Sequence, residues 1–187
     1  MVPPATPSQT AGPFVSIGTE WAAGRNSADE QDPESIVVSG VVYDGAGAPV
    51  TDAMLEFWQA GLNGQAQGTG GGWAGFARVL TGESGRYRLV TKKPPRLPAG
   101  EGAAPEAPHI DVSIFARGLL QRLVTRIYFP DEPSNSQDAV LSSLSDEVRA
   151  RLTAQQGVPG GDDGRHIVYE FDIHLQGEQE TVFFAPW

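Results

Sequence analysis

Short runs of valine, isoleucine, leucine, phenylalanine and tyrosine recur along this chain, and clusters of glycine and proline separate them. There are 23 glycines and 15 prolines among the 187 residues. Runs of this kind are typical of strands, and the clusters between them are typical of turns. The pattern therefore predicts a mostly β protein in which two antiparallel sheets pack face to face as a β-sandwich.

About eight strands are expected from these runs. They cover residues 36–43, 54–58, 76–80, 86–91, 109–116, 123–129, 166–173 and 181–184. The segment 109–116 alternates most clearly, because Ile110, Val112 and Ile114 share one face with Ala116. We expect that face to meet the core, since successive side chains of a strand point to opposite sides.

The segment 146–156 carries the signals of one short surface helix. Ser145 can cap its first turn, Asp146 and Glu147 place negative charge at its start, and Gly157 follows its end. Its apolar stripe is thin, so we expect it to cover one end of the sandwich.

Two long segments, residues 1–34 and 91–108, show no periodicity. A chain of this length suits one domain, and a compact domain rarely holds long structureless segments unless they bind something or are disordered. We therefore expect an extended N-terminal arm over residues 1–34 and a single sandwich domain over residues 35–187. A frayed terminus is the alternative for the arm.

Composition excludes several classes of protein. The chain has no cysteine, which excludes a disulfide scaffold, a thiolate zinc site and a cysteine nucleophile. Its net charge of -10 would repel a nucleic-acid backbone. It shows no long apolar run and no basic flank before an apolar stretch at its start, so we expect a cytoplasmic protein with neither a nucleic-acid nor a membrane partner.

Few residues could hold a metal ion. The three histidines are His109, His166 and His174. His109 and Asp111 share one strand face at a spacing that metal sites use, although such a pair can equally satisfy itself by hydrogen bonding. The other two histidines are too far apart along one extended segment to share an ion, and we expect them at the surface.

Five short motifs occur together in order. They are TPSQTAGPF at residues 6–14, WQA at 58–60, PHID at 108–111, SIFARG at 113–118 and GEQETVFF at 177–184. In this order and spacing the chain resembles the intradiol ring-cleaving dioxygenases nearly from end to end. The resemblance implies the sandwich fold and a reaction in which O₂ opens a catechol ring between its two hydroxyl-bearing carbons.

The resemblance also implies that this chain lacks most of the family's iron ligands. Catalytic chains of that family hold a ferric ion with two tyrosines and two histidines. Here Ala66 stands where the first tyrosine is expected, no tyrosine lies between Tyr87 and Tyr128, and the histidine pair reads His109-x-Asp111. Glu106 also replaces the arginine that precedes the first histidine. One imidazole and one carboxylate cannot replace two phenolates around Fe(3+), so we expect no metal site and no catalytic residue in this chain.

The resemblance then implies an α-type chain that pairs with a homologous β subunit. The β chain would hold the Fe(3+), and αβ pairs would form a higher oligomer. The substrate would be protocatechuate, which O₂ converts to 3-carboxy-cis,cis-muconate, a step of aromatic catabolism in the β-ketoadipate pathway.

Four residues of this chain match α-chain positions that contribute to the substrate pocket. Thr10, Gly12 and Pro13 of the arm would approach the partner's site, and Arg117 would pair with the substrate carboxylate or set the local potential. Arg117 lies about 26 Å of extended strand from His109, so it would serve a neighbouring chain's site. Arg126 is a second candidate, for an ion pair between chains.

Two other functions are open at this point. One is a stand-alone sandwich that binds a ligand and has lost its partner; a stable monomer in solution would favour it. The other is a metalloenzyme that uses His109 and Asp111, which the small number of ligands disfavours.

Overall fold

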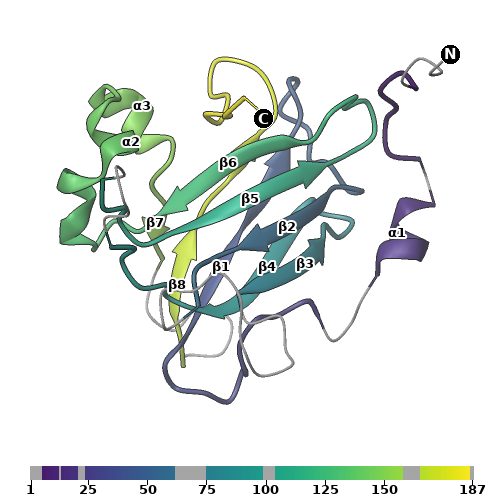
Figure 1. Cartoon of the computed structure of the whole chain (residues 1–187). Helices are drawn as coiled ribbons and strands as arrows, with labels where there is room; N and C mark the ends of the chain where they lie inside the picture. Colours follow the sequence, from purple (N-terminus) through teal and green to yellow (C-terminus); the bar gives the residue numbers. More distant parts are fainter. Residues whose placement is uncertain are drawn as a thin grey trace, which may run out of the picture.

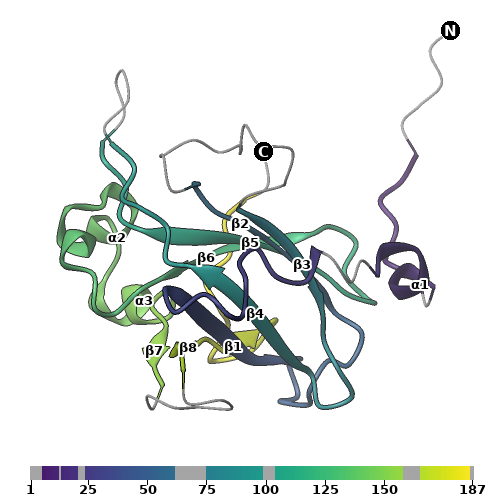
Figure 2. The same ribbon diagram turned by 90° about the horizontal axis from the view of Figure 1, so that it is seen from below.

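Two sheets pack face to face in this protein, as the sequence predicts (Figures 1 and 2). The computed structural model describes residues 6–12, 14–20, 24–61, 75–98, 104–157 and 165–185. One sheet has the strand order β4-β1-β8-β7, with β9 also paired to β1, and the other has the order β3-β2-β5-β6. Strands β8 and β9 run parallel to β1, whereas the other described pairs are antiparallel.

The described strands and helices have the following bounds. The strands are β1 (Ser35–Tyr43), β2 (Met54–Trp58), β3 (Phe76–Leu80), β4 (Arg86–Lys92), β5 (His109–Phe115), β6 (Leu123–Tyr128), β7 (Gln155–Gln156), β8 (Ile167–Glu170) and β9 (Ile173–His174). The helices are α1 (Val15–Thr19), α2 (Ala139–Ser142), α3 (Asp146–Ala150) and the 3-10 helix η2 (Pro133–Gln137).

The core lies between the sheets, and alternate residues of the central strands line it. Leu55 and Phe57 of β2, and Ile110, Val112 and Ile114 of β5, are at most 2% exposed. Burial of each such side chain contributes about 1.5–3 kcal/mol. A shift of one residue would turn the whole set toward solvent, so the alternation that the sequence shows fixes the register. The predicted core face of β5 is confirmed.

The helix predicted over residues 146–156 is wrong in its second half. Ser145 does cap α3, by accepting a hydrogen bond from the amide of Val148, but the helix ends at Ala150. Leu152 then enters a buried cluster and its carbonyl accepts from the amide of Tyr128 at 2.8 Å. Pairing with β6 and burial outweigh helix propensity here, because tertiary packing supplies most of the stability of a short helix.

The strand predicted over residues 166–173 is interrupted. Between β8 and β9 the carboxylate of Asp172 accepts from the amide of Val41 at 2.8 Å, so a side chain replaces one rung of the ladder. The carbonyl of Ser39 still accepts from the amide of Phe171 at 2.8 Å. The interruption therefore leaves both halves attached to β1.

The strand predicted over residues 181–184 is wrong. A single bridge joins Val124 to Phe184. The hydroxyl of Thr125 donates to the carbonyl of Val182 at 2.8 Å, so a side chain satisfies part of this backbone. The segment lies along β6 without extending the sheet.

The half of the N-terminal segment nearest to β1 is attached to the sandwich. The amide of Ser27 donates to the carbonyl of Val90 at 3.0 Å, and the side chain of Asn26 accepts from the amide of Val90 at 3.0 Å. Residues 24–34 therefore run beside β4 as part of the domain.

This attachment explains why the surface position expected for His166 is wrong. His166 was expected at the surface, but it is 4% exposed, with Nε2 3.1 Å from the carbonyl oxygen of Glu30. His174 is half-buried and stacks on the ring of Tyr43, with 4.9 Å between ring centroids. The segment that covers His166 lies more than a hundred residues earlier, which local periodicity cannot reveal.

The part of the arm around α1 stands away from the sheets (Figures 1 and 2). It contains the short helix α1, so the expectation of a wholly extended arm is wrong there. Phe14 and Ile17 are 75% and 77% exposed. Within the described residues no helix has the length and apolar character needed to cross a bilayer.

Gly40 of β1 lies directly against the backbone of Phe171. A Cβ atom there would lie 2.0 Å from the carbonyl oxygen of Phe171 and 3.1 Å from Cε1 of Tyr87. We expect Gly40→Ala to lower the free energy of unfolding by about 2–4 kcal/mol, because backbone must move to relieve the overlap. Urea unfolding followed by tryptophan fluorescence measures this change.

The matched control is Gly82→Ala. A Cβ at Gly82 would meet nothing within 4 Å, so we expect a change of less than about 1 kcal/mol. Equal losses in the two variants would contradict this account of Gly40.

Candidate functional site

The pair His109 and Asp111 lies on the face of β5 that points away from the core. Antiparallel pairing with β6 sets Asp111 opposite Arg126 and His109 opposite Tyr128. Directly opposed residues place their side chains on one face of a sheet. The register therefore gathers an imidazole, a carboxylate, a guanidinium and a phenol at one place.

Arg126 forms the centre of this cluster. Its Nε donates to Oδ1 of Asp111 at 2.9 Å, and its Nη1 donates to Oε2 of Glu106 at 2.7 Å. Burial works against the charged guanidinium, but the hydrogen bond to Tyr128 and the nearby charges outweigh it and raise the pKa of Arg126. Arg126, expected to pair with another chain, thus has two carboxylate partners in its own chain.

His109 is 7% exposed and is oriented by its own backbone. Its Nδ1 lies 2.8 Å from the carbonyl oxygen of Ala107, which assigns the N–H to Nδ1. Its Nε2 then points toward Oε2 of Glu106 at 3.5 Å and Oδ2 of Asp111 at 3.8 Å. The pair predicted from the sequence is therefore a real cluster, with Glu106 as its third member.

Tyr128 joins the cluster to a buried carboxylate. Its hydroxyl donates to Oδ1 of Asp138 at 3.3 Å, and Asp138, which is fully buried, also accepts from the amides of Ala107 and Leu141 at 2.8 and 2.9 Å. Burial raises the pKa of Tyr128 to about 12, Arg126 opposes that rise and Asp138 adds to it. The phenol stays protonated at neutral pH.

This donor set does not fit a ferric ion. The phenol is neutral, and a guanidinium holds both carboxylates. Ala66, which stands in place of one family tyrosine, lies outside the described residues. Among residues that are described, no group of three or more histidine, cysteine, aspartate or glutamate side chains is arranged to hold a metal ion. The geometry therefore gives no support to a metalloenzyme that uses His109 and Asp111.

Two of the predicted substrate-binding residues, Thr10 and Arg117, lie at the opposite end of β5. Figure 1 shows the start of β5 on the side of α2 and α3 and its end on the side of α1. The hydroxyl of Thr10 accepts from the amide of Gly118 at 2.7 Å and donates to the carbonyl of Ala116 at 3.4 Å. These bonds hold the arm against the residues on both sides of Arg117.

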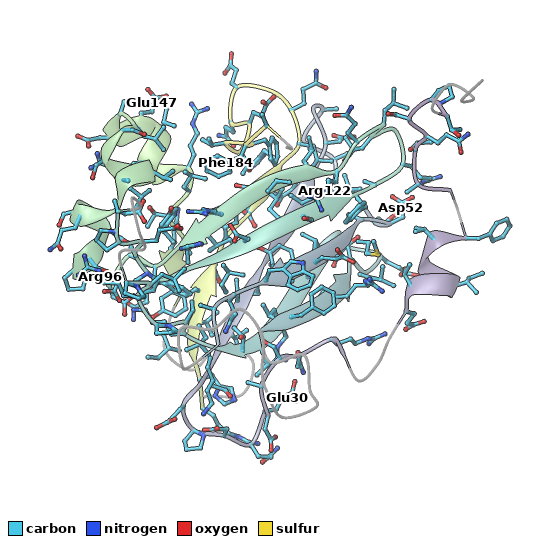
Figure 3. The ribbon with its side chains drawn as sticks, viewed as in Figure 1. Glu30, Asp52, Arg96, Arg122, Glu147 and Phe184 are labelled. Carbon is cyan, nitrogen blue, oxygen red and sulfur yellow. The ribbon has the colours of Figure 1, made fainter. Side chains whose placement is uncertain are left out.

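Arg117 has a partner in its own chain that the sequence did not predict. Its Nε forms an ion pair with Oδ2 of Asp52, in the turn before β2, and its side chain is 64% exposed. Figure 3 shows Asp52 and Arg122 at this same end of the sheet. Gly12 is exposed, with open space around its Cα, and Pro13 lies outside the described residues.

A hollow of about 360 Å³ separates the arm from the sheet at this end. Thr10, Val15, Met54, Phe115 and Leu119 are among the residues that line it. The structure therefore brings Thr10 and Arg117 together and keeps both away from His109.

Only one of these two pairings, that of Asp111 with Arg126, left a signal in the sequence. Asp111 and Arg126 are equidistant from the turn at Gly118 and Leu119, so the hairpin alone could have predicted their pairing. Asp52 left no signal, because the β2–β5 pairing that brings its turn near Arg117 is long-range.

Comparison with known proteins identifies the family. A family model described as "Dioxygenase" matches residues 11–177. The chain belongs to the intradiol dioxygenase family. It is 40% identical to the protocatechuate 3,4-dioxygenase alpha chain of Burkholderia cepacia, over 96% of each chain. It is 33% identical to the beta chain from the same organism, over 84% of this chain and 72% of that one.

A solved structure shows the same fold. It is the dioxygenase domain of a dioxygenase–carbohydrate-binding protein fusion from Streptomyces sp. SirexAA-E. The TM-score is 0.63, the sequence identity is 25%, and the match covers 92% of this chain and 99% of that domain. The family therefore keeps this sandwich in proteins of different domain organisation.

The hydroxyl of Thr10 should hold the arm in place. We expect Thr10→Val, which keeps the side-chain shape, to speed exchange of the Gly118 amide proton about fivefold to tenfold, since one hydrogen bond contributes about 1 kcal/mol. Hydrogen exchange measured by NMR tests this. Thr10→Ser should retain the protection, and unchanged exchange in Thr10→Val would show that the bond does not hold the arm.

Proposed function

We propose that this chain is the iron-free α chain of a protocatechuate 3,4-dioxygenase. Together with an iron-bearing β chain it would cleave protocatechuate with O₂ to 3-carboxy-cis,cis-muconate. One observation carries the proposal. The chain matches alpha chains over nearly its whole length, while its own His109 cluster is closed by ion pairs to Arg126 and offers no phenolate.

In this proposal Fe(3+) is bound by the β chain, and the α chain shapes the pocket from outside. The match to a beta chain supports descent from a common sandwich. A homologous partner can pack against this chain through equivalent surfaces, and αβ pairs would assemble further in the cytoplasm. No step of the reaction passes through a metal in this chain.

The exposed arm supports a partner at this end of the molecule. Phe14 and Ile17 are among the most exposed large apolar side chains described, and exposed apolar patches mark interaction sites. Thr10 holds the arm to the sheet end, so Gly12 and Pro13 would reach the partner's pocket from a fixed base.

Arg117 is the residue that we propose for substrate binding. Asp52 engages its Nε, and a guanidinium has further N–H donors on its outer edge. A benzoate carboxylate can pair with these in a bidentate manner. In a chain of net charge -10, such a fixed cation would also offset the repulsion of an anionic substrate.

Co-expression with a β-type chain that carries both tyrosines and His-x-His tests the division of labour. We expect the α chain alone to be colourless, without stoichiometric iron and without turnover. The complex should contain about one Fe per αβ pair and cleave protocatechuate. Iron and turnover in the α chain alone would overturn the proposal. A stable monomer that does not bind the β chain would favour a stand-alone binding module.

Removal of the Arg117 charge should weaken recognition of the carboxylate. In the αβ complex we expect Arg117→Ala to raise KM for protocatechuate about tenfold or more, because a hydrogen-bonded charge pair contributes about 1.5–3 kcal/mol. KM for catechol, which lacks the carboxylate, should stay within about twofold. Steady-state kinetics with both substrates measures the split.

The matched control is Arg122→Ala, an exposed arginine at the same end of the sheet. It should leave both KM values unchanged. An equal rise in KM for the two substrates in Arg117→Ala would contradict the proposed role of Arg117 in binding the substrate carboxylate.

A further inference from the structure

A second cavity, of about 400 Å³, opens on the outer face of the sheet that contains β2, β5 and β6. The strand register brings its lining together. Trp58 of β2 lies opposite Asp111 of β5. On the other side of β5, Arg126 lies opposite Asp111 and Val124 lies opposite Ser113. A cavity of this size is typical of small-molecule sites, which combine apolar walls with a few polar groups.

Aromatic and aliphatic side chains form the walls of this cavity. Trp58 is 40% exposed, and its ring packs on Phe76 with 4.4 Å between centroids, so a neighbour holds its orientation. Phe184 lies on the C-terminal segment beside β6, where a bridge joins it to Val124 (Figure 3). Val140 of α2 also contributes apolar surface. Such a lining favours a planar aromatic ring, because rings pack well against other rings.

The hydroxyl of Ser113 indicates a ligand with a hydrogen-bonding group. Ser113 is 7% exposed and lines the cavity. Within the part of the chain that the structure describes, no residue forms a hydrogen bond with this hydroxyl. A buried hydroxyl without a partner is rare in folded proteins, because the lost hydrogen bond costs free energy. A ligand hydroxyl that enters the cavity would supply a partner.

The charges around the cavity favour a neutral ligand. Oδ1 of Asp111 accepts from Nε of Arg126 at 2.9 Å, while Oδ2 lies 3.8 Å from Nε2 of His109, beyond hydrogen-bond distance. Oδ2 can therefore accept a hydrogen bond from a ligand hydroxyl, and it would repel a ligand carboxylate. Arg126 does not offset this repulsion, because Glu106 engages it as well. Arg122 also lines the cavity, but it is exposed, so solvent screens its charge.

We propose that this cavity binds a small neutral phenol. The ring packs against Trp58, and the hydroxyl donates to Asp111 and accepts from Ser113. This ligand differs in charge from the carboxylate-bearing substrate of the proposed function. The proposal concerns binding alone, without a covalent step, and it holds whether or not this chain pairs with a β chain.

NMR titration of the full-length chain without a β chain tests the proposal. The probe is 4-fluorophenol at pH 7, where a phenol is neutral. We expect it to shift the amide signals of Ser113, Val124 and Phe184, and its fluorine signal reports the Kd. The Kd for 4-fluorobenzoate should be at least about tenfold higher, because like charges close together are unfavourable. Cyclohexanol, which keeps the hydroxyl and lacks the aromatic ring, should bind about threefold to tenfold more weakly.

Two variants test the two kinds of contact. Ser113→Ala removes one hydrogen bond and should raise the Kd for 4-fluorophenol about fivefold. Trp58→Leu removes the ring and keeps an apolar side chain, and it should raise the Kd about threefold or more. The matched control is Ser39→Ala, a half-buried serine of β1 in the other sheet, which should leave the Kd unchanged.

Three outcomes would overturn the proposal. The first is a set of shifted amides that leaves out Ser113, Val124 and Phe184, which wild type alone reveals even when a variant does not fold. The second is 4-fluorobenzoate that binds as tightly as 4-fluorophenol. The third is an equal Kd for 4-fluorophenol in folded Ser113→Ala and Ser39→Ala. Failure of the proposed function would instead appear as missing turnover with the β chain, which this titration does not measure.

Discussion

The antiparallel register of β5 on β6 is the constraint on which both regions of interest depend. It sets Asp111 opposite Arg126 and His109 opposite Tyr128, so the outer face of the sheet carries a cluster of ion-paired side chains. The same strand directs Ile110, Val112 and Ile114 into the core. Because one register serves both faces, the core that stabilises the sandwich also holds the ion pairs in position. A slip of one residue would destroy both.

The fold does not need the cluster to hold a metal. The apolar residues between the sheets form a continuous core, and the cluster lies outside it. Asp138, although fully buried, is satisfied by two backbone amides and the phenol of Tyr128, so its burial needs no external cation. A sandwich of this kind can lose metal ligands without losing its structure.

The sequence predicted the central strands closely and the periphery poorly. Apolar runs between turns located β2 and β3, and period-two alternation identified the core face of β5, because a strand's own side chains decide which face is buried. Helix α3 ends early because Leu152 packs beside Tyr128, and His166 is buried because residues 24–34 cover it. Both results depend on contacts between segments that are far apart in the sequence. The local pattern of residues cannot predict such contacts. Glu106 likewise joins the His109 cluster through its ion pair with Arg126. The β5–β6 hairpin could have predicted that Arg126 pairs with Asp111. It could not have predicted that Glu106 is the second carboxylate partner.

The sequence by itself determined the mostly β class and the core face of β5, because residue identity and period two are local properties. Tertiary structure alone decided that Arg126 pairs within its own chain, that Asp52 holds Arg117, and that Thr10 fastens the arm beside it. These contacts join residues brought together by strand pairing and packing. Their free energy depends on distance and on burial, and a list of residue types specifies neither.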